Sequence, residues 1–352
     1  MQEREKLKSR LGFLLISAGC AIGVGNVWKF PYMAGQGGGG TFLLFYVLFL
    51  VIMGLPIMTM EFAVGRASQK SPVKAYQALE KPGQKWHIHG YITLIGCYLL
   101  MMFYTTVTGW MLHYFVLTAK GTFEGLDAAG VETVFNDMLG QPLVMGGWMV
   151  LVVVVCMFIC SRGLQNGLEK ITKVMMLALM VLMLVLAVNS CLLDGAGEGL
   201  KFYLLPDFDR MMEAGIGNTI VGAMNQSFFT LSLGIGAMAI FGSYIGKERS
   251  LLGESINVAL LDTFVAFTAG LIIFPACFSY GVDQTAGPSL IFITLPNIFN
   301  HMPLGRMWGC LFFICMTFAA ISTVLAVFEN IITCGMELTG CSRKKSALVN
   351  LV

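Results

Sequence analysis

The chain has 352 residues, of which 57% are hydrophobic and 12% are charged, and its formal net charge is +2. This balance lies far outside that of soluble domains, so the sequence predicts an integral membrane protein. A net charge so close to zero gives no reason to expect a nucleic-acid partner.

Eight apolar stretches reach the length of about 20 residues that a helix needs to cross a bilayer. In chain order they cover residues 12–34, 41–64, 87–117, 142–160, 168–193, 216–245, 255–280 and 304–339. A ninth stretch begins at Ser346 and stops at Val352. The expected fold class is therefore an all-α, multi-pass membrane protein with about eight complete transmembrane helices.

Basic residues predict which side of the membrane each loop faces, because short cytoplasmic loops carry an excess of Lys and Arg. With a cytoplasmic N-terminus, most of the 22 basic residues fall on the inside, including Lys70, Lys74 and the run 343–345. The opposite loops are rich in acids such as Glu124 and Asp207. The sequence therefore predicts a cytoplasmic N-terminus.

The ten cysteines and four histidines lack the spacing of a metal or redox site. Most cysteines fall within apolar stretches, where a free thiol behaves as a small hydrophobic group. The sequence contains no nucleophile–base pair and no phosphate-binding loop, so we expect neither an enzyme nor an organic cofactor. A channel is disfavoured because no stretch has a continuous polar face.

Two apolar stretches contain closely spaced glycines beside residues with side-chain oxygens. The first reads GCAIGVGN from Gly19 to Asn26, and the sixth reads FTLSLGIG from Phe229 to Gly236. Glycine costs a helix about 1 kcal/mol relative to alanine, so such clusters favour a break. In one span alone, the same glycine spacing is more often a surface for close helix packing than a break. Two matching breaks, five spans apart, favour an inverted-repeat transporter that binds ions and substrate where its helices are interrupted.

Five segments resemble signatures of the sodium-coupled neurotransmitter and amino-acid symporters, in their bacterial branch. They read GNVWKFPYMAGQGGGGTF, MEFAVGR, GLEKITK, FFTLSLGIGAM and GPSLIFITLP. The resemblance implies one transporter domain with the fold of the bacterial leucine transporter, in which helices 1 and 6 are broken. Residues 1–193 would form the first five-helix repeat and residues 216–352 an incomplete second one. Because family members normally have eleven or twelve spans, it also implies a chain truncated after the eighth. The resemblance implies a location in the bacterial inner membrane. It leaves open whether the protein forms a homodimer.

The resemblance also implies two sodium sites. The first would be formed by Ala21, Asn26, Thr230 and Asp262, where the spacing favours Asp262 over Asn257. The second would be formed by Gly19, Ile22, Ala319, Ser322 and Thr323. Residues 319, 322, 323 and 327 share one helical face, although such hydroxyls more often bond back to their own helix. Oxygen ligands with little fixed charge suit a monovalent cation.

An amino-acid substrate would lie between the two breaks. The implied contacts are Ala21, Val24, Gly25, Leu100, Tyr104, Phe229, Thr230, Ser232, Ile235, Thr323 and Val327. Its carboxylate would meet backbone N–H groups near Val24 and Gly25, at the N-terminus of a half-helix, where the dipole favours anions. Tyr104 would complete this contact, and its alternative role is that of a core or interfacial aromatic residue.

The family's gates are implied at both ends of the site. Arg4 and Glu337 would form the cytoplasmic gate, and Lys29 stands at the outer gate, where the family commonly has arginine. Glu61 would brace the unwound segments, with an interfacial glutamate as the alternative.

The expected function is sodium-coupled import of amino acids by alternating access, with sodium ions, the substrate and the lipid bilayer as partners. Ile235 stands where the leucine transporter has a phenylalanine, which leaves room for hydrophobic or aromatic substrates.

Asp262 lies in an apolar span, where a charge without a partner costs about 2.5–3.5 kcal/mol. The alternative is that Asp262 is a protonated, hydrogen-bonded acid of the core. Chloride-dependent relatives have Asn at the position of Asp262 and Ser at the position of Ala266, and they use the anion to balance the first sodium. Here Asp262 would supply that negative charge, so we expect transport to be independent of chloride. A non-transporting remnant or regulatory subunit is the alternative.

Overall fold

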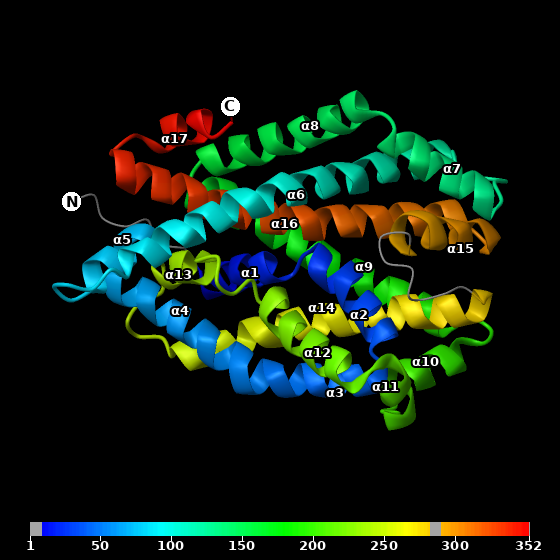
Figure 1. Cartoon of the computed structure of the whole chain (residues 1–352). Coiled ribbons are helices and arrows are strands. Elements are labelled where there is room, and N and C mark those ends of the chain that lie inside the picture. Colours follow the sequence, from blue (N-terminus) through cyan, green and yellow to red (C-terminus); the bar gives the residue numbers. More distant parts are fainter. Residues whose placement is uncertain (1–8, 282–289, 352) are drawn as a thin grey trace.

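The computed structural model describes residues 9–281 and 290–351, and this part of the chain folds into helices without strands. The long helices run side by side as an elongated bundle (Figure 1). The predicted all-α membrane fold is confirmed. The division into two five-helix repeats stays a prediction.

Six helical segments within the described residues are long and apolar enough to cross a membrane. They are Gly40–Ser68, His87–Lys120, Pro142–Ser161, Gly167–Cys191, Leu251–Tyr280 and Gly305–Thr339. A seventh consists of the pair Arg10–Ala21 and Gly25–Gln36, which is bent by 55° at a short break. The sequence predicted eight, and the difference lies in the sixth predicted stretch, 216–245, which is not continuous.

That stretch forms two short helices, α12 (Ile216–Thr230) and α13 (Ala237–Gly242), neither of which can span a bilayer alone. Between them the backbone leaves the helical region, with φ of 51° at Ser232, 86° at Gly234 and 72° at Gly236. Positive φ is strained for residues other than glycine, so the two glycines permit this break. The predicted interruption of the sixth apolar stretch, between α12 and α13, is therefore present.

The first span is interrupted in the same way. Helix α1 (Arg10–Ala21) ends before an extended residue, Ile22, and the chain continues through a π-helical turn, η1 (Gly25–Lys29), into α2 (Phe30–Gln36). The second span joins α3 (Gly40–Phe49), the π-helical turn η2 (Leu50–Gly54) and α4 (Leu55–Ser68).

The remaining elements follow in chain order. They are α5 (Pro72–Leu79), α6 (His87–Lys120), α7 (Ala128–Leu139), α8 (Pro142–Ser161), η3 (Leu164–Glu169), α9 (Lys170–Cys191), α10 (Ala196–Leu204), α11 (Phe208–Ala214), α14 (Leu251–Tyr280), η4 (Leu290–Thr294), α15 (Leu295–His301), α16 (Gly305–Thr339) and α17 (Arg343–Val349). The ninth apolar stretch thus falls partly in α17, a helix of seven residues.

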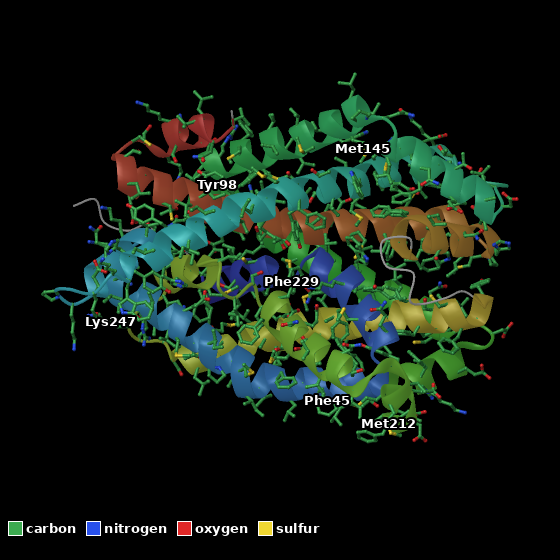
Figure 2. All side chains as sticks on the ribbon, viewed as in Figure 1. Phe45, Tyr98, Met145, Met212, Phe229 and Lys247 are labelled. Atoms are coloured by element: carbon green, nitrogen blue, oxygen red, sulfur yellow. The ribbon has the colours of Figure 1, made fainter. Side chains whose placement is uncertain are left out.

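The two ends of the bundle differ in what they carry. The first described residues, α5, α17 and Lys247 lie at one end, whereas α7, α10, α11, α15 and Met212 lie at the other (Figures 1 and 2). Helices α5 and α17 and Lys247, which all carry basic residues, therefore share one end, and the cytoplasmic orientation of that end stays a prediction.

Helices α14 and α16 occupy the interior. In their most apolar windows, 67% and 78% of residues are buried, compared with 28% in α8. Helix α16 packs against α6, α9 and α1, and it is lined with buried small and polar residues such as Ala319, Ser322 and Asn330. Peripheral side chains such as Leu99 and Met102 are exposed and apolar, as expected for surfaces facing lipid. The center of the bundle is therefore where polar groups collect.

Candidate functional site

The two broken helices face each other and leave polar backbone groups without helical partners. The ends of α1 and α12 present carbonyl groups, and the following half-helices present N–H groups. At membrane depth these groups need partners or a cavity. Glycine is required where Gly23 approaches α6 and α16, since an added Cβ would lie 2.1 Å from the Tyr104 hydroxyl and 2.6 Å from Oγ1 of Thr323.

A buried oxygen cluster joins the first break, α12 and α14. Asn26 Nδ2 donates to Oδ1 of Asp262 at 2.7 Å and to Oγ1 of Thr230 at 3.0 Å. Thr230 donates its hydroxyl to Oδ2 of Asp262 at 2.8 Å. Each of the three residues exposes at most 1% of its surface. The structure thus brings together three residues predicted for the first sodium site, and the fourth, Ala21, ends α1.

A second cluster lies between the first break and α16. Thr323 Oγ1 is 3.1 Å from the carbonyl of Ile22 and 3.3 Å from that of Gly19. Ser322 Oγ is 3.4 Å from the Ile22 carbonyl, and it also bonds back to the carbonyl of Ala319 at 2.8 Å. All five residues predicted for the second sodium site are therefore in one set of contacts. Ser322 additionally has the within-helix bond that was the alternative.

A cavity of about 210 Å³ opens beside the first break. It is lined by Val24, Gly25, Trp28, Lys29, Tyr32, Phe103, Tyr104 and Phe229. The backbone N–H of Val24 donates to the Tyr104 hydroxyl at 2.9 Å, which is the pair expected to meet a carboxylate.

Four predicted substrate contacts and Lys29 line this cavity. The other predicted contacts are not among its lining residues: Ala21, Leu100, Thr230, Ser232, Ile235, Thr323 and Val327. Sequence reasoning missed Trp28, Tyr32 and Phe103. Trp28 and Tyr32 lie within the quoted signature of the first stretch, so their spacing from Gly25 was an available signal.

Lys29 lies over the ring of Phe229, with its ammonium 3.7 Å from the ring centroid. This distance is typical of a cation–π contact. Phe229 is 40% exposed and stands near the middle of the bundle (Figure 2). The residue predicted as the outer gate therefore contacts a residue predicted for substrate binding.

Side chains from other helices hold the second break. Ser232 Oγ donates to the carbonyl of Cys20 at 2.9 Å, which ties the two breaks together. Glu61 on α4 accepts a hydrogen bond of 2.7 Å from the N–H of Gly234. Glu61 thus lies where a brace of the unwound segments is expected.

Of the two residues predicted for the cytoplasmic gate, Arg4 lies outside the described residues. Glu337, near the end of α16, accepts hydrogen bonds from the N–H of Ser71 at 2.8 Å and from its hydroxyl at 2.6 Å. The pairing of Glu337 with Arg4 stays a prediction.

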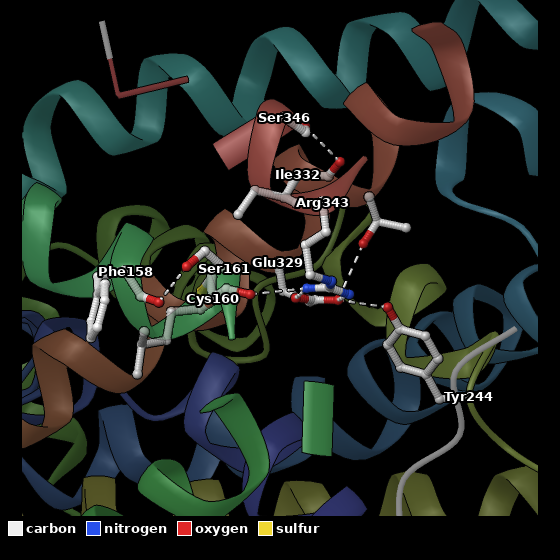
Figure 3. Close-up of polar contacts among 10 residues, drawn as sticks. Phe158, Cys160, Ser161, Tyr244, Glu329, Ile332, Arg343 and Ser346 are labelled. Carbon is white, nitrogen blue, oxygen red and sulfur yellow. Dashed lines mark hydrogen bonds and ion pairs between the residues drawn. The ribbon is translucent and has the colours of Figure 1, made fainter. Parts of the chain in front are cut away.

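A buried ion pair that sequence reasoning missed joins α16 and α17 (Figure 3). Arg343 contacts both carboxylate oxygens of Glu329, at 2.7 and 3.0 Å, and Glu329 is fully buried. Tyr244 donates its hydroxyl to the same carboxylate at 2.9 Å, and Arg343 also reaches the carbonyl of Cys160 at 3.2 Å. Glu329 lies in an apolar span that is followed by the basic run 343–345, and this pattern was the signal from which the pair could have been predicted.

The sequence model of the sodium:neurotransmitter symporter family matches residues 4–124 and 137–352. The chain belongs to this family. Its members are transporters, so the expectation of a transporter rather than an enzyme is confirmed.

Relatives described as sodium-dependent transporters are similar to nearly the whole chain. An uncharacterized sodium-dependent transporter of Bacillus subtilis is 36% identical over 92% of this chain and 71% of its own length. One of Haemophilus influenzae is 30% identical over 99% of this chain and 78% of its own length. The crystal structure of MhsT in complex with L-phenylalanine is 37% identical, with a TM-score of 0.90, over 99% of this chain and 78% of MhsT. The expected fold is therefore confirmed.

Proposed function

We propose that this member of the family is a sodium-coupled symporter that imports amino acids by alternating access. The observation that carries the proposal is the convergence of Asn26, Thr230 and Asp262 at the point where both broken helices meet. The Thr230 hydroxyl and the Asp262 carboxylate, together with the Asn26 amide once its oxygen is turned toward them, would replace the hydration shell of a small cation there, and the carboxylate would supply a negative charge. Sodium and substrate bound at adjacent breaks would then stabilise each other.

The proposed substrates are hydrophobic or aromatic amino acids. The cavity beside the Val24–Tyr104 pair is lined by Trp28, Phe103 and Phe229, which favour an apolar side chain. MhsT, which has the same fold, was solved with L-phenylalanine. The Val24 N–H and the Tyr104 hydroxyl are positioned to bind the carboxylate common to all amino acids.

Uptake by the purified protein in proteoliposomes tests both parts of the proposal. We expect an inward sodium gradient to drive uptake of radiolabelled L-phenylalanine, and we expect tyrosine or tryptophan to compete better than glycine or alanine. Uptake that is unaffected by sodium contradicts the symporter, and stronger competition by glycine or alanine contradicts the substrate class. A chain that binds sodium and amino acid without transporting them supports the regulatory alternative.

We further propose that the protein lies in the bacterial inner membrane with its N-terminus in the cytoplasm. The end of the bundle near the first described residues carries α5, α17 and Lys247 (Figures 1 and 2), and an excess of basic residues favours the cytoplasmic side. An N-terminal tag should react with a membrane-impermeant reagent in inverted vesicles and not in intact cells. The reverse pattern contradicts this orientation.

Asn26→Ala is expected to weaken sodium binding by at least about tenfold, because a cation in a low-dielectric site loses a ligand and Asp262 loses a donor. The measurement is the sodium concentration that half-activates L-phenylalanine binding to the purified protein. Asn136→Ala on the exposed face of α7 is the matched control and should leave that concentration unchanged. The same sodium dependence in Asn26→Ala and the parent contradicts the assignment.

A further inference from the structure

Lys29 is the one charged residue among those that line the cavity beside the first break. The other lining residues are five aromatic residues, one valine and one glycine. Among the described residues, no acidic side chain forms an ion pair with Lys29. A positive charge in such a cavity is costly unless water, polar groups or aromatic ring faces stabilise it.

An aromatic ring already contacts this charge from one side. The ammonium of Lys29 lies 3.7 Å from the ring centroid of Phe229, and both residues line the cavity. Phe229 is 40% exposed and Lys29 is only partly buried, so the protein does not enclose the pair. A side chain bound in the cavity would therefore lie beside both the ammonium and the ring.

The presence of water determines the strength of a cation–π contact. The contact is weak where water surrounds the cation, and it is stronger where water is excluded. A substrate ring in the cavity would exclude water from Lys29 and add a second aromatic face. A saturated side chain of the same size would exclude the same water, but it has no negative ring face to offer the ammonium.

We propose that Lys29 is a specificity-determining residue that makes this site prefer aromatic amino acids to aliphatic ones of the same size. The preference comes from the charge of Lys29, which a substrate ring stabilises together with Phe229. This inference rests on the proposed function, because it concerns the amino acids that the same cavity accepts. It narrows the proposed substrates from hydrophobic or aromatic amino acids to the aromatic ones.

The test compares L-phenylalanine with L-cyclohexylalanine, in which a saturated ring replaces the aromatic one. The measurement is the ratio of their inhibition constants against radiolabelled L-phenylalanine, on purified protein in saturating sodium. We expect the parent to bind L-phenylalanine about tenfold more tightly, because only the aromatic ring stabilises the ammonium. Lys29→Met removes the charge and keeps an unbranched apolar side chain, so it should bring the ratio close to one.

Two further variants separate this contact from other effects of charge. Lys29→Arg keeps a cation that packs on ring faces, so it should retain a clear preference for L-phenylalanine. Lys120→Met removes an exposed lysine at the end of α6, outside the residues that line the cavity, and should retain the parent's ratio. Equal weakening of both amino acids in Lys29→Met indicates that Lys29 acts on their common carboxylate, and it overturns the inference.

Fluorinated substrates test the contact without any substitution in the protein. Fluorine withdraws electrons from the ring face and so weakens its attraction for a cation. We expect the inhibition constant to rise from L-phenylalanine through its mono- and trifluorinated forms, and to be about tenfold higher for the pentafluorinated form. This series decides the inference even if Lys29→Met does not fold.

The outcomes distinguish this inference from the proposed function. A parent that binds L-phenylalanine and L-cyclohexylalanine equally well, or that shows no trend with fluorination, contradicts the role of Lys29 and leaves the symporter standing. The same ratio in Lys29→Met and the parent has the same meaning. A parent that binds no amino acid contradicts the proposed function, and this inference with it.

Discussion

Asp262→Asn is expected to abolish amino-acid uptake in chloride-free buffer. The substitution keeps the size of the side chain and removes the negative charge that faces Asn26 and Thr230. A sodium ion in this buried cluster then has no anionic ligand, and stabilising a lone cation at such a depth is costly.

Chloride provides the second half of this test. Ala266 is buried one helical turn after Asp262, and Ala266→Ser would place a hydroxyl beside the vacated charge. The double variant should therefore transport only when chloride is present, whereas the parent should transport equally well with or without chloride. The control is Asp137→Asn on the exposed face of α7, which should behave as the parent. Full uptake by Asp262→Asn without chloride contradicts the assigned role.

Arg343→Met is expected to lower the free energy of unfolding by about 3–5 kcal/mol, the usual result of removing one partner of a buried ion pair. Glu329 is fully buried and Arg343 is 13% exposed, so water cannot replace the lost partner. Among the described residues, the other donors to the carboxylate are the neutral hydroxyls of Tyr244 and Thr333. Denaturant-induced unfolding in detergent, followed by tryptophan fluorescence, measures the change.

A second substitution separates charge from packing. Glu329→Gln/Arg343→Met removes both charges, and it should recover much of the lost stability because no uncompensated charge stays buried. Arg306→Met is the matched control: Arg306 faces Glu124 at 3.6 Å with both side chains more than half exposed, so its loss should change stability by about 1 kcal/mol or less. If Arg343→Met and Arg306→Met are equally stable, the buried pair does not have the assigned importance.

The sequence determined the parts of this protein that depend on local chemistry. The length of each apolar stretch fixed where most long helices lie, because a segment crossing a bilayer must satisfy its own backbone and present an apolar surface. The glycines at 234 and 236 likewise determined a break, since they permit backbone angles that other residues resist. Apolar length alone overestimated continuity in 216–245, where those same glycines divide the helix.

Only the tertiary structure decided which distant groups meet. Asn26 and Asp262 are 236 positions apart in the chain, and their contact follows from the packing of the first break against α14. The sequence placed them together through a family resemblance and not through any local rule. The contact of Lys29 with Phe229 and the hydrogen bond from Asn330 to the carbonyl of Ile235 had no such guide. Hydropathy and helical periodicity describe neighbours within one element, whereas these contacts depend on how helices far apart in the sequence pack.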